Sequence, residues 1–128
     1  MSYHFSKTVN LPFDKAIEKT TAALKEEGFG VLTNIDIKET LKNKLDVEFR
    51  KYHILGACNP IQAHKALQAE EHIGLMLPCN VIVQEHENGT VEVSAVDPIA
   101  SMKAVENESL GEVAQNVQTL LKKVIEKL

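Results

Sequence analysis

The sequence lacks a surplus of positive charge. Its 14 lysine and arginine residues are outnumbered by 18 aspartate and glutamate residues, so the formal net charge is -4. The basic residues also form no run longer than a pair. A protein surface that neutralises the phosphates of nucleic acid needs clustered lysine and arginine. We therefore expect no nucleic acid among the main partners of this chain.

Long hydrophobic segments are also missing. No apolar run approaches the ~20 residues that a helix needs to cross a bilayer, so we expect no membrane partner. The N-terminal stretch MSYHFSKTVN lacks the apolar core of a secretory signal, which leads us to expect a cytoplasmic location. The chain has only two cysteines, and in a reducing compartment we expect free thiols rather than a structural disulfide.

The common signatures of catalysis and metal binding are absent. The sequence contains no Gly-rich phosphate loop, no Gly-x-Ser-x-Gly elbow, and neither the Cys-x-x-Cys nor the His-x-x-x-His spacing of metal sites. An ordinary hydrolase or transferase is therefore the least favoured function. A metal site built from Cys58, Cys79 and His64 has weak support, so we predict no metal ligands, and the sequence names no cofactor.

The composition that remains is that of an ordinary soluble domain. Of the 128 residues, 44% are hydrophobic and 25% are charged, which suits one hydrophobic core and excludes disordered and fibrous classes. We find no repeat, low-complexity tract or linker. We therefore treat residues 1–128 as a single domain.

Apolar periodicity along the chain predicts an α+β fold. Alternation predicts strands at 3–9, 29–37, 52–58, 74–87 and 91–96, and helical spacing predicts helices at 12–27, 37–45, from 60 to about 70, 98–105 and 109–128. The last helix begins with a capping box of Ser109 and Glu112. The order β-α-β-α-β-α-β-β-α-α predicts a two-layer domain with a mostly antiparallel sheet and helices on one face.

The stretch 52–80 holds both cysteines, in the sequences Cys58-Asn59-Pro60 and Pro78-Cys79-Asn80. Asn59 and Pro60 are a favourable N-cap and first residue of a helix. Cys58 thus ends a strand directly before a helix N-terminus, where a thiolate is stabilised and pKa values from ~3.5 to 7.5 occur. Pro78 cannot donate to a strand ladder, so we expect a bulge or interruption beside Cys79.

If the two strands are neighbours, the thiols of Cys58 and Cys79 meet near one end of the sheet. The amides of Asn59 and Asn80 would then surround a shared pocket. Such a pocket suits a small-molecule ligand, thiol–disulfide exchange, thiol-mediated group transfer or soft-metal binding. Any catalysis would use Cys58 as the nucleophile and Cys79 as the resolving or positioning thiol.

Two further polar residues are candidates for this pocket. His64, about one turn into the helix that Pro60 opens, would be a general base for Cys58. Asp97, which precedes Pro98, would be an acceptor for a ligand. Each has a structural alternative, since His64 suits an exposed helix position and Asp97 suits a helix cap.

A structural role for the thiols stays open as well. Free cysteine is among the most buried residue types and packs as a small hydrophobic side chain. Cys79 also shares a strand face with Leu77 and Val81, as a core residue would. The alternative function is therefore a non-catalytic homodimeric structural or interaction module. Its contact would be an exposed sheet face or edge, or the apolar stripe of the C-terminal helix.

Four segments of the chain carry a family resemblance, namely 52–60 (YHILGACNP), 74–80 (GLMLPCN), Gly28-Phe29 and Val96-Asp97-Pro98. On these motifs the chain resembles the domain-of-unknown-function family 302 over nearly its whole length. The resemblance implies a fold similar to the TATA-box-binding-protein-like α+β group and a homodimer. It does not imply DNA binding, because one fold hosts many unrelated functions, and the family has no settled activity.

Overall fold

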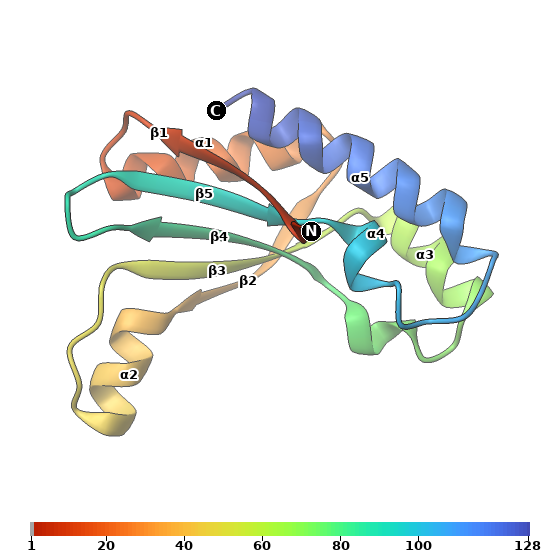
Figure 1. The fold of residues 1–128 in the computed structure, drawn as a ribbon, viewed down its shortest axis with the longest axis horizontal. Coiled ribbons are helices and arrows are strands. Elements are labelled where there is room, and N and C mark those ends of the chain that lie inside the picture. Colours follow the sequence, from red (N-terminus) through yellow and green to blue (C-terminus); the bar gives the residue numbers. More distant parts are fainter. Residues whose placement is uncertain (1) are drawn as a thin grey trace.

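A five-stranded antiparallel sheet forms the centre of the computed structural model, which describes residues 2–128 (Figure 1). The predicted α+β class and element order are confirmed, with one additional 3-10 helix, η1. The elements in chain order are β1 (His4–Val9), α1 (Phe13–Glu26), β2 (Gly30–Asp36), α2 (Ile37–Leu45), β3 (Tyr52–Cys58), α3 (Pro60–Ala69), η1 (Ile73–Met76), β4 (Cys79–Glu85), β5 (Val91–Val96), α4 (Pro98–Ser101) and α5 (Leu110–Glu126).

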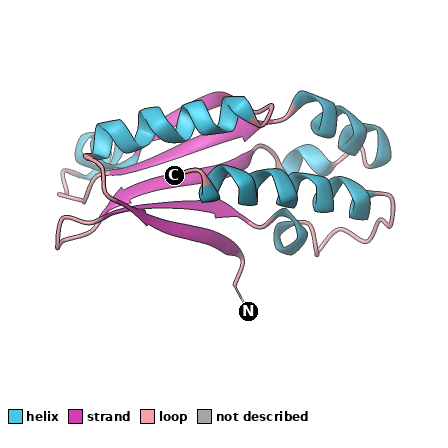
Figure 2. Ribbon diagram, turned by 90° about the horizontal axis from the view of Figure 1, so that it is seen from above, coloured by secondary structure: helices cyan, strands magenta, loops and turns pink. Residues whose placement is uncertain are grey.

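The strands lie in the order β1-β5-β4-β3-β2, so β1 and β2 are the edges of the sheet. Helices α1 and α5 lie side by side over one face (Figure 2). The apolar stripe of α5, including Val117, Leu121 and Val124, is buried against this face. The sheet contributes Val81, Val83 and other buried residues, which alternate along its central strands. Within residues 2–128, no helix is long and apolar enough to cross a membrane.

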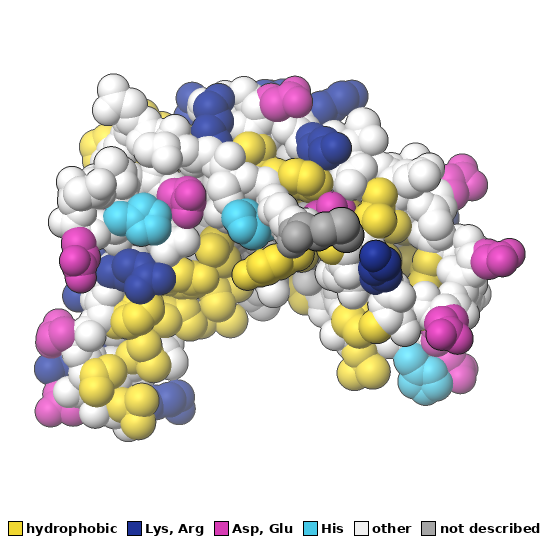
Figure 3. Space-filling model, viewed as in Figure 1, with side chains coloured by type: hydrophobic (Ala, Val, Ile, Leu, Met, Phe, Trp, Pro, Cys, Tyr) yellow, Lys and Arg dark blue, Asp and Glu magenta, His cyan; other side chains and the backbone are white. Residues whose placement is uncertain are grey.

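The opposite face of the sheet is hollow (Figure 3). In the same view, α2 projects at one end of the hollow and the η1 segment at the other, so the domain has the outline of an arch (Figure 1). Hydrophobic side chains gather on the sheet face that forms the roof of this arch, and on its two ends. The exposed ones include Ile35, Leu45, Leu75 and Met76.

The strand predicted at 74–87 is shorter than expected. The ladder begins at Cys79, directly after Pro78, because proline has no N–H to donate. Ahead of it, a 3-10 turn buries Ile73 completely. Of the bulge or interruption expected beside Cys79, the interruption is present, since the strand does not extend through Pro78. A register shift lies elsewhere, between Val31 and Thr33 of β2.

The start of α5 also differs from the prediction. Ser109 makes no side-chain cap and already has helical backbone angles, with φ -65 and ψ -17. Its N–H donates instead to Oδ1 of Asn107 at 3.0 Å. The predicted capping box with Glu112 was therefore wrong, because an N-cap side chain acts from an extended backbone. The helix predicted at 98–105 is limited to Pro98–Ser101.

Gly56, in the middle of β3, lies where its neighbours leave little space for a side chain. A Cβ added there would lie 2.8 Å from Cγ of Pro78 and still closer to Oγ1 of Thr33. We expect Gly56→Ala to lower the free energy of unfolding by roughly 1–3 kcal/mol through overpacking, measured by urea denaturation. Gly30→Ala is the control, since a Cβ there meets nothing within 4 Å. An equal effect of the two substitutions would contradict this account.

Candidate functional site

The two thiols lie at one end of neighbouring strands. In the ladder between β3 and β4, Ala57 is paired with Cys79, which places Cys58 one residue further along. Both cysteines are free and both line one cavity between the strand ends, α3 and α5. We refer to this space, of about 30 Å³, as the thiol cavity. The predicted meeting of the two cysteine-bearing strands at one end of the sheet is thus present.

Asn59 orders the start of α3 beside this cavity. Its Oδ1 accepts the N–H of Gln62 at 3.2 Å, and its Nδ2 donates to the carbonyl oxygen of Glu27 at 3.5 Å. Pro60 occupies the first turn, as predicted. Asn59 also lines the cavity, and each end of its amide makes one of these hydrogen bonds. The two bonds order the start of α3.

Gln62 is a residue of the site that the sequence analysis missed. It lines the thiol cavity, and its Oε1 is buried without a hydrogen-bond partner among the residues described. Gln62 stands three residues after the N-cap, where a glutamine side chain often reaches back to the N–H of the cap residue. That spacing predicts a bonded side chain, and here the bond is not made, so no sequence signal pointed to an unpaired oxygen.

The two thiols differ in their surroundings. Cys79 is buried, whereas Cys58 is half-buried. Burial raises the pKa of the Cys79 thiol to about 11, and the neighbouring Cys58 thiol adds to the rise. At neutral pH Cys79 is therefore protonated and a poor nucleophile, because the thiolate is the reactive form. Cys58 is the thiol that a ligand can reach.

The other candidate residues lie away from the thiol cavity. Asn80 is exposed and belongs to the hollow face, next to the roof of the arch. His64 is exposed on α3 and does not line the cavity. Asp97 caps α4 by accepting the N–H of Ile99 at 3.0 Å, and it also accepts Nε2 of Gln118 at 3.1 Å. In residues 2–128 no three His, Cys, Asp or Glu side chains are grouped to hold a metal ion.

Residues 5–128 match the sequence family described as Domain of unknown function DUF302. The chain belongs to the DUF302 family. Its structure is similar to the crystal structure of an uncharacterized conserved DUF302 protein from Bacillus stearothermophilus, with a TM-score of 0.92 and 29% sequence identity. That match covers 99% of this chain and 98% of the other. No curated protein matches the chain. The resemblance noted in the sequence is thereby confirmed.

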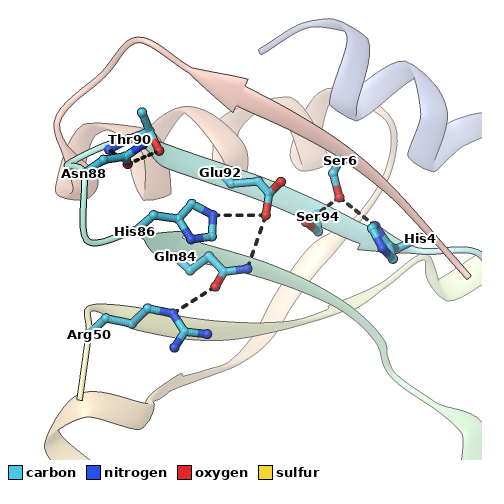
Figure 4. Close-up of polar contacts among 9 residues, drawn as sticks. All are labelled: His4, Ser6, Arg50, Gln84, His86, Asn88, Thr90, Glu92 and Ser94. Carbon is cyan, nitrogen blue, oxygen red and sulfur yellow. Dashed lines mark hydrogen bonds and ion pairs between the residues drawn. The ribbon is translucent and has the colours of Figure 1, made fainter. Parts of the chain in front are cut away.

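This DUF302 domain also carries a polar network on the hollow face (Figure 4). Arg50 donates from Nε to Oε1 of Gln84 at 3.0 Å, and Nε2 of Gln84 donates to Glu92 at 3.3 Å. Nε2 of His86 lies 3.4 Å from the same oxygen of Glu92. The network joins a loop to two strands, and the sequence analysis did not find it.

A second polar group lies farther along the same face (Figure 4). The hydroxyls of Ser6 and Ser94 are 2.6 Å apart, and Nδ1 of His4 is 2.7 Å from Oγ of Ser6. These residues come from β1 and β5, which pair across the sheet. The hollow face is therefore not purely apolar, and hydrogen bonds among its polar side chains hold them in place.

The raised pKa of Cys79 makes the stability of this DUF302 domain depend on pH. The unfolded thiol releases its proton near pH 9, whereas the folded thiol holds it to about pH 11. Stability is therefore fully present below pH 9 and is lost as the pH rises through this window. We expect the wild type to lose roughly 2 kcal/mol more than Cys79→Ala between these limits, measured by urea denaturation at each pH. Parallel pH profiles of the two proteins would refute the assignment.

Proposed function

We propose that this DUF302 domain binds a small ligand in the thiol cavity. A hydrogen-bond donor of the ligand bonds to Oε1 of Gln62, and the ligand lies against the thiol of Cys58. Thiol chemistry at the site, where it occurs, uses Cys58 as the nucleophile. Cys79 is the positioning thiol in this proposal, since burial keeps it protonated at neutral pH.

The unpaired oxygen of Gln62 is the observation that carries this proposal. Buried polar atoms in proteins are nearly always hydrogen-bonded. A buried acceptor without a partner costs about 1–3 kcal/mol. Gln62 lines the thiol cavity together with both cysteines, so a donor that reached this oxygen from the cavity would recover the free energy.

The dimensions and lining of the cavity limit the ligand. Its space of about 30 Å³ holds about two water-sized groups. Apolar side chains such as Phe29, Leu77 and Met102 form much of the wall. A small donor group, such as an amide or hydroxyl, therefore enters, and the rest of the ligand stays at the mouth. A charged group is disfavoured, because the apolar wall would leave it without compensation.

Iodoacetamide is a suitable probe, because it combines an amide donor with an electrophilic carbon. The Cys58 thiolate forms the S–C bond, iodide departs with the electron pair of the C–I bond, and the thiol proton goes to solvent. We expect Gln62→Met to slow alkylation of Cys58 roughly threefold to tenfold, which is the worth of one hydrogen bond. Rates are measured at each cysteine by peptide mass spectrometry on the native protein.

Two controls separate ligand recognition from a change in structure. The reagent 2-iodo-N,N-dimethylacetamide has no N–H donor, so its rate at Cys58 should not respond to Gln62→Met. The substitution Gln68→Met, at an exposed position of the same helix, should leave both rates unchanged. An iodoacetamide rate at Cys58 that is the same in Gln62→Met and wild type would overturn the proposal, as would full protection of Cys58 until the protein unfolds.

We propose as a second function that the domain acts as a homodimeric interaction module through α2 and the edge strand β2. The support is that α2, a helix of nine residues, has no buried residue. Isolated helices of this length are marginal in water, so packing against a partner would stabilise α2. Leu32, Leu45 and Val47 offer apolar surface there, with 66%, 66% and 42% of each residue exposed.

Light scattering coupled to size-exclusion chromatography tests this module. We expect the mass of a dimer for the wild type and of a monomer for Leu45→Glu, because a carboxylate in an apolar contact is costly to desolvate. Asn43→Glu introduces the same charge at an exposed position of the same helix and should remain dimeric. A wild type that is monomeric at all concentrations would exclude the homodimer.

A further inference from the structure

Arg50 is the single arginine of the chain, and the fold holds its guanidinium in place. Its Nε donates to Gln84 at 3.0 Å. The guanidinium carbon also lies 4.5 Å from the ring centre of Phe49 and 5.3 Å from that of Tyr52. Among residues 2–128, the hydrogen bond of the Arg50 side chain is made by Nε, and the terminal nitrogens make none. A fixed guanidinium fork with unused terminal N–H groups matches the geometry of a carboxylate.

An open groove of about 400 Å³ begins at Arg50 on the hollow face. It follows β4 from Gln84 past Ile82 to Asn80, a length of about 13 Å at the rise of a β-strand. Ile82 provides an apolar floor, and Tyr52 lines the groove near Arg50. Ser94, which is paired with Ile82 across the sheet, adds a hydroxyl beside the floor. The groove thus has a cationic end, an apolar middle and hydrogen-bonding groups beyond.

The charges around the groove restrict the ligand further. Glu92 lines the groove too, where Gln84 and His86 hold its carboxylate. The carboxylate of Glu92 partly offsets the positive charge of Arg50, so each further negative charge on a ligand is less favourable. A monoanion is therefore favoured over a phosphate dianion, and the net charge of -4 opposes polyanions in general.

We infer that this groove binds an organic monocarboxylate with an apolar body. The carboxylate bonds to the terminal nitrogens of Arg50, and the apolar body lies on Ile82 and Tyr52. The groove shares no lining residue with the thiol cavity, so this site is independent of the function proposed above. It is built from the central part of the sheet rather than from α2 and the β2 edge.

Sodium benzoate and benzamide are matched probes for this site, since they differ in charge but hardly in shape. We expect benzoate to cause saturable shifts of the backbone amide signals of Tyr52, Ile82 and Ser94 in a ¹H–¹⁵N NMR titration. Benzamide should bind about tenfold more weakly or not at all, because a charge-assisted pair is lost. Arg50→Gln should weaken benzoate binding by a similar factor.

Lys51→Gln is the control variant, because it removes one positive charge at the adjacent position. Lys51 lines a different hollow with Phe13, Asp36 and His53, so benzoate affinity should stay within about twofold of wild type, as expected for screened charges. The inference is overturned if benzoate gives no saturable shift, if benzamide binds equally well, or if Arg50→Gln binds benzoate like the wild type. Equal losses in both variants would also overturn it, since they would indicate a general charge effect.

Discussion

The antiparallel pairing of β3 with β4 is the constraint on which the rest of the structure depends. Leu55 is paired with Val81 in this ladder, and both are completely buried beneath the helices. The same register pairs Ala57 with Cys79, which brings both thiols to one cavity. A shift of one residue would turn the buried set toward the hollow face, since side chains alternate along a strand. The hydrophobic free energy of the core therefore fixes the location of the thiol cavity as well.

Local sequence signals predicted much of the fold because they act through neighbouring residues. Asn59 and Pro60 begin α3 as expected, since a cap and a fixed φ angle need only the adjacent backbone. The alternation of side chains along a strand corrects one part of the predicted pocket, the place of Asn80. Cys79 faces the core, so Asn80, as the next residue of the strand, must face the opposite side. The period of the strand thus places Asn80 outside the thiol pocket.

Other features depend on contacts between distant segments, and no local pattern contains them. The irregularity between Val31 and Thr33 pairs them with Ala57 and Gly56, which follow one another in β3. Val31 and Thr33 therefore face opposite sides, whereas two residues at this spacing in a regular strand share one side. The network of Arg50 and Gln84 needs a loop and a strand that are 34 residues apart. No sequence pattern shows that the oxygen of Gln62 is unpaired. The usual partner of a glutamine at this position is the backbone N–H of the N-cap residue, and the sequence offers that partner as well.

The sheet presents different chemistry on its two faces, and one strand serves both. In β4, Cys79 lines the thiol cavity while Asn80 lines the groove of the hollow face. The helix-covered side is apolar and leaves one acceptor unpaired, which is the basis for proposing a small neutral donor there. The hollow side has an arginine near a carboxylate, both bonded to Gln84, which is the basis for inferring a monoanion with an apolar body there. Because successive side chains of a strand point to opposite faces, the register of β4 sets the position of both sites.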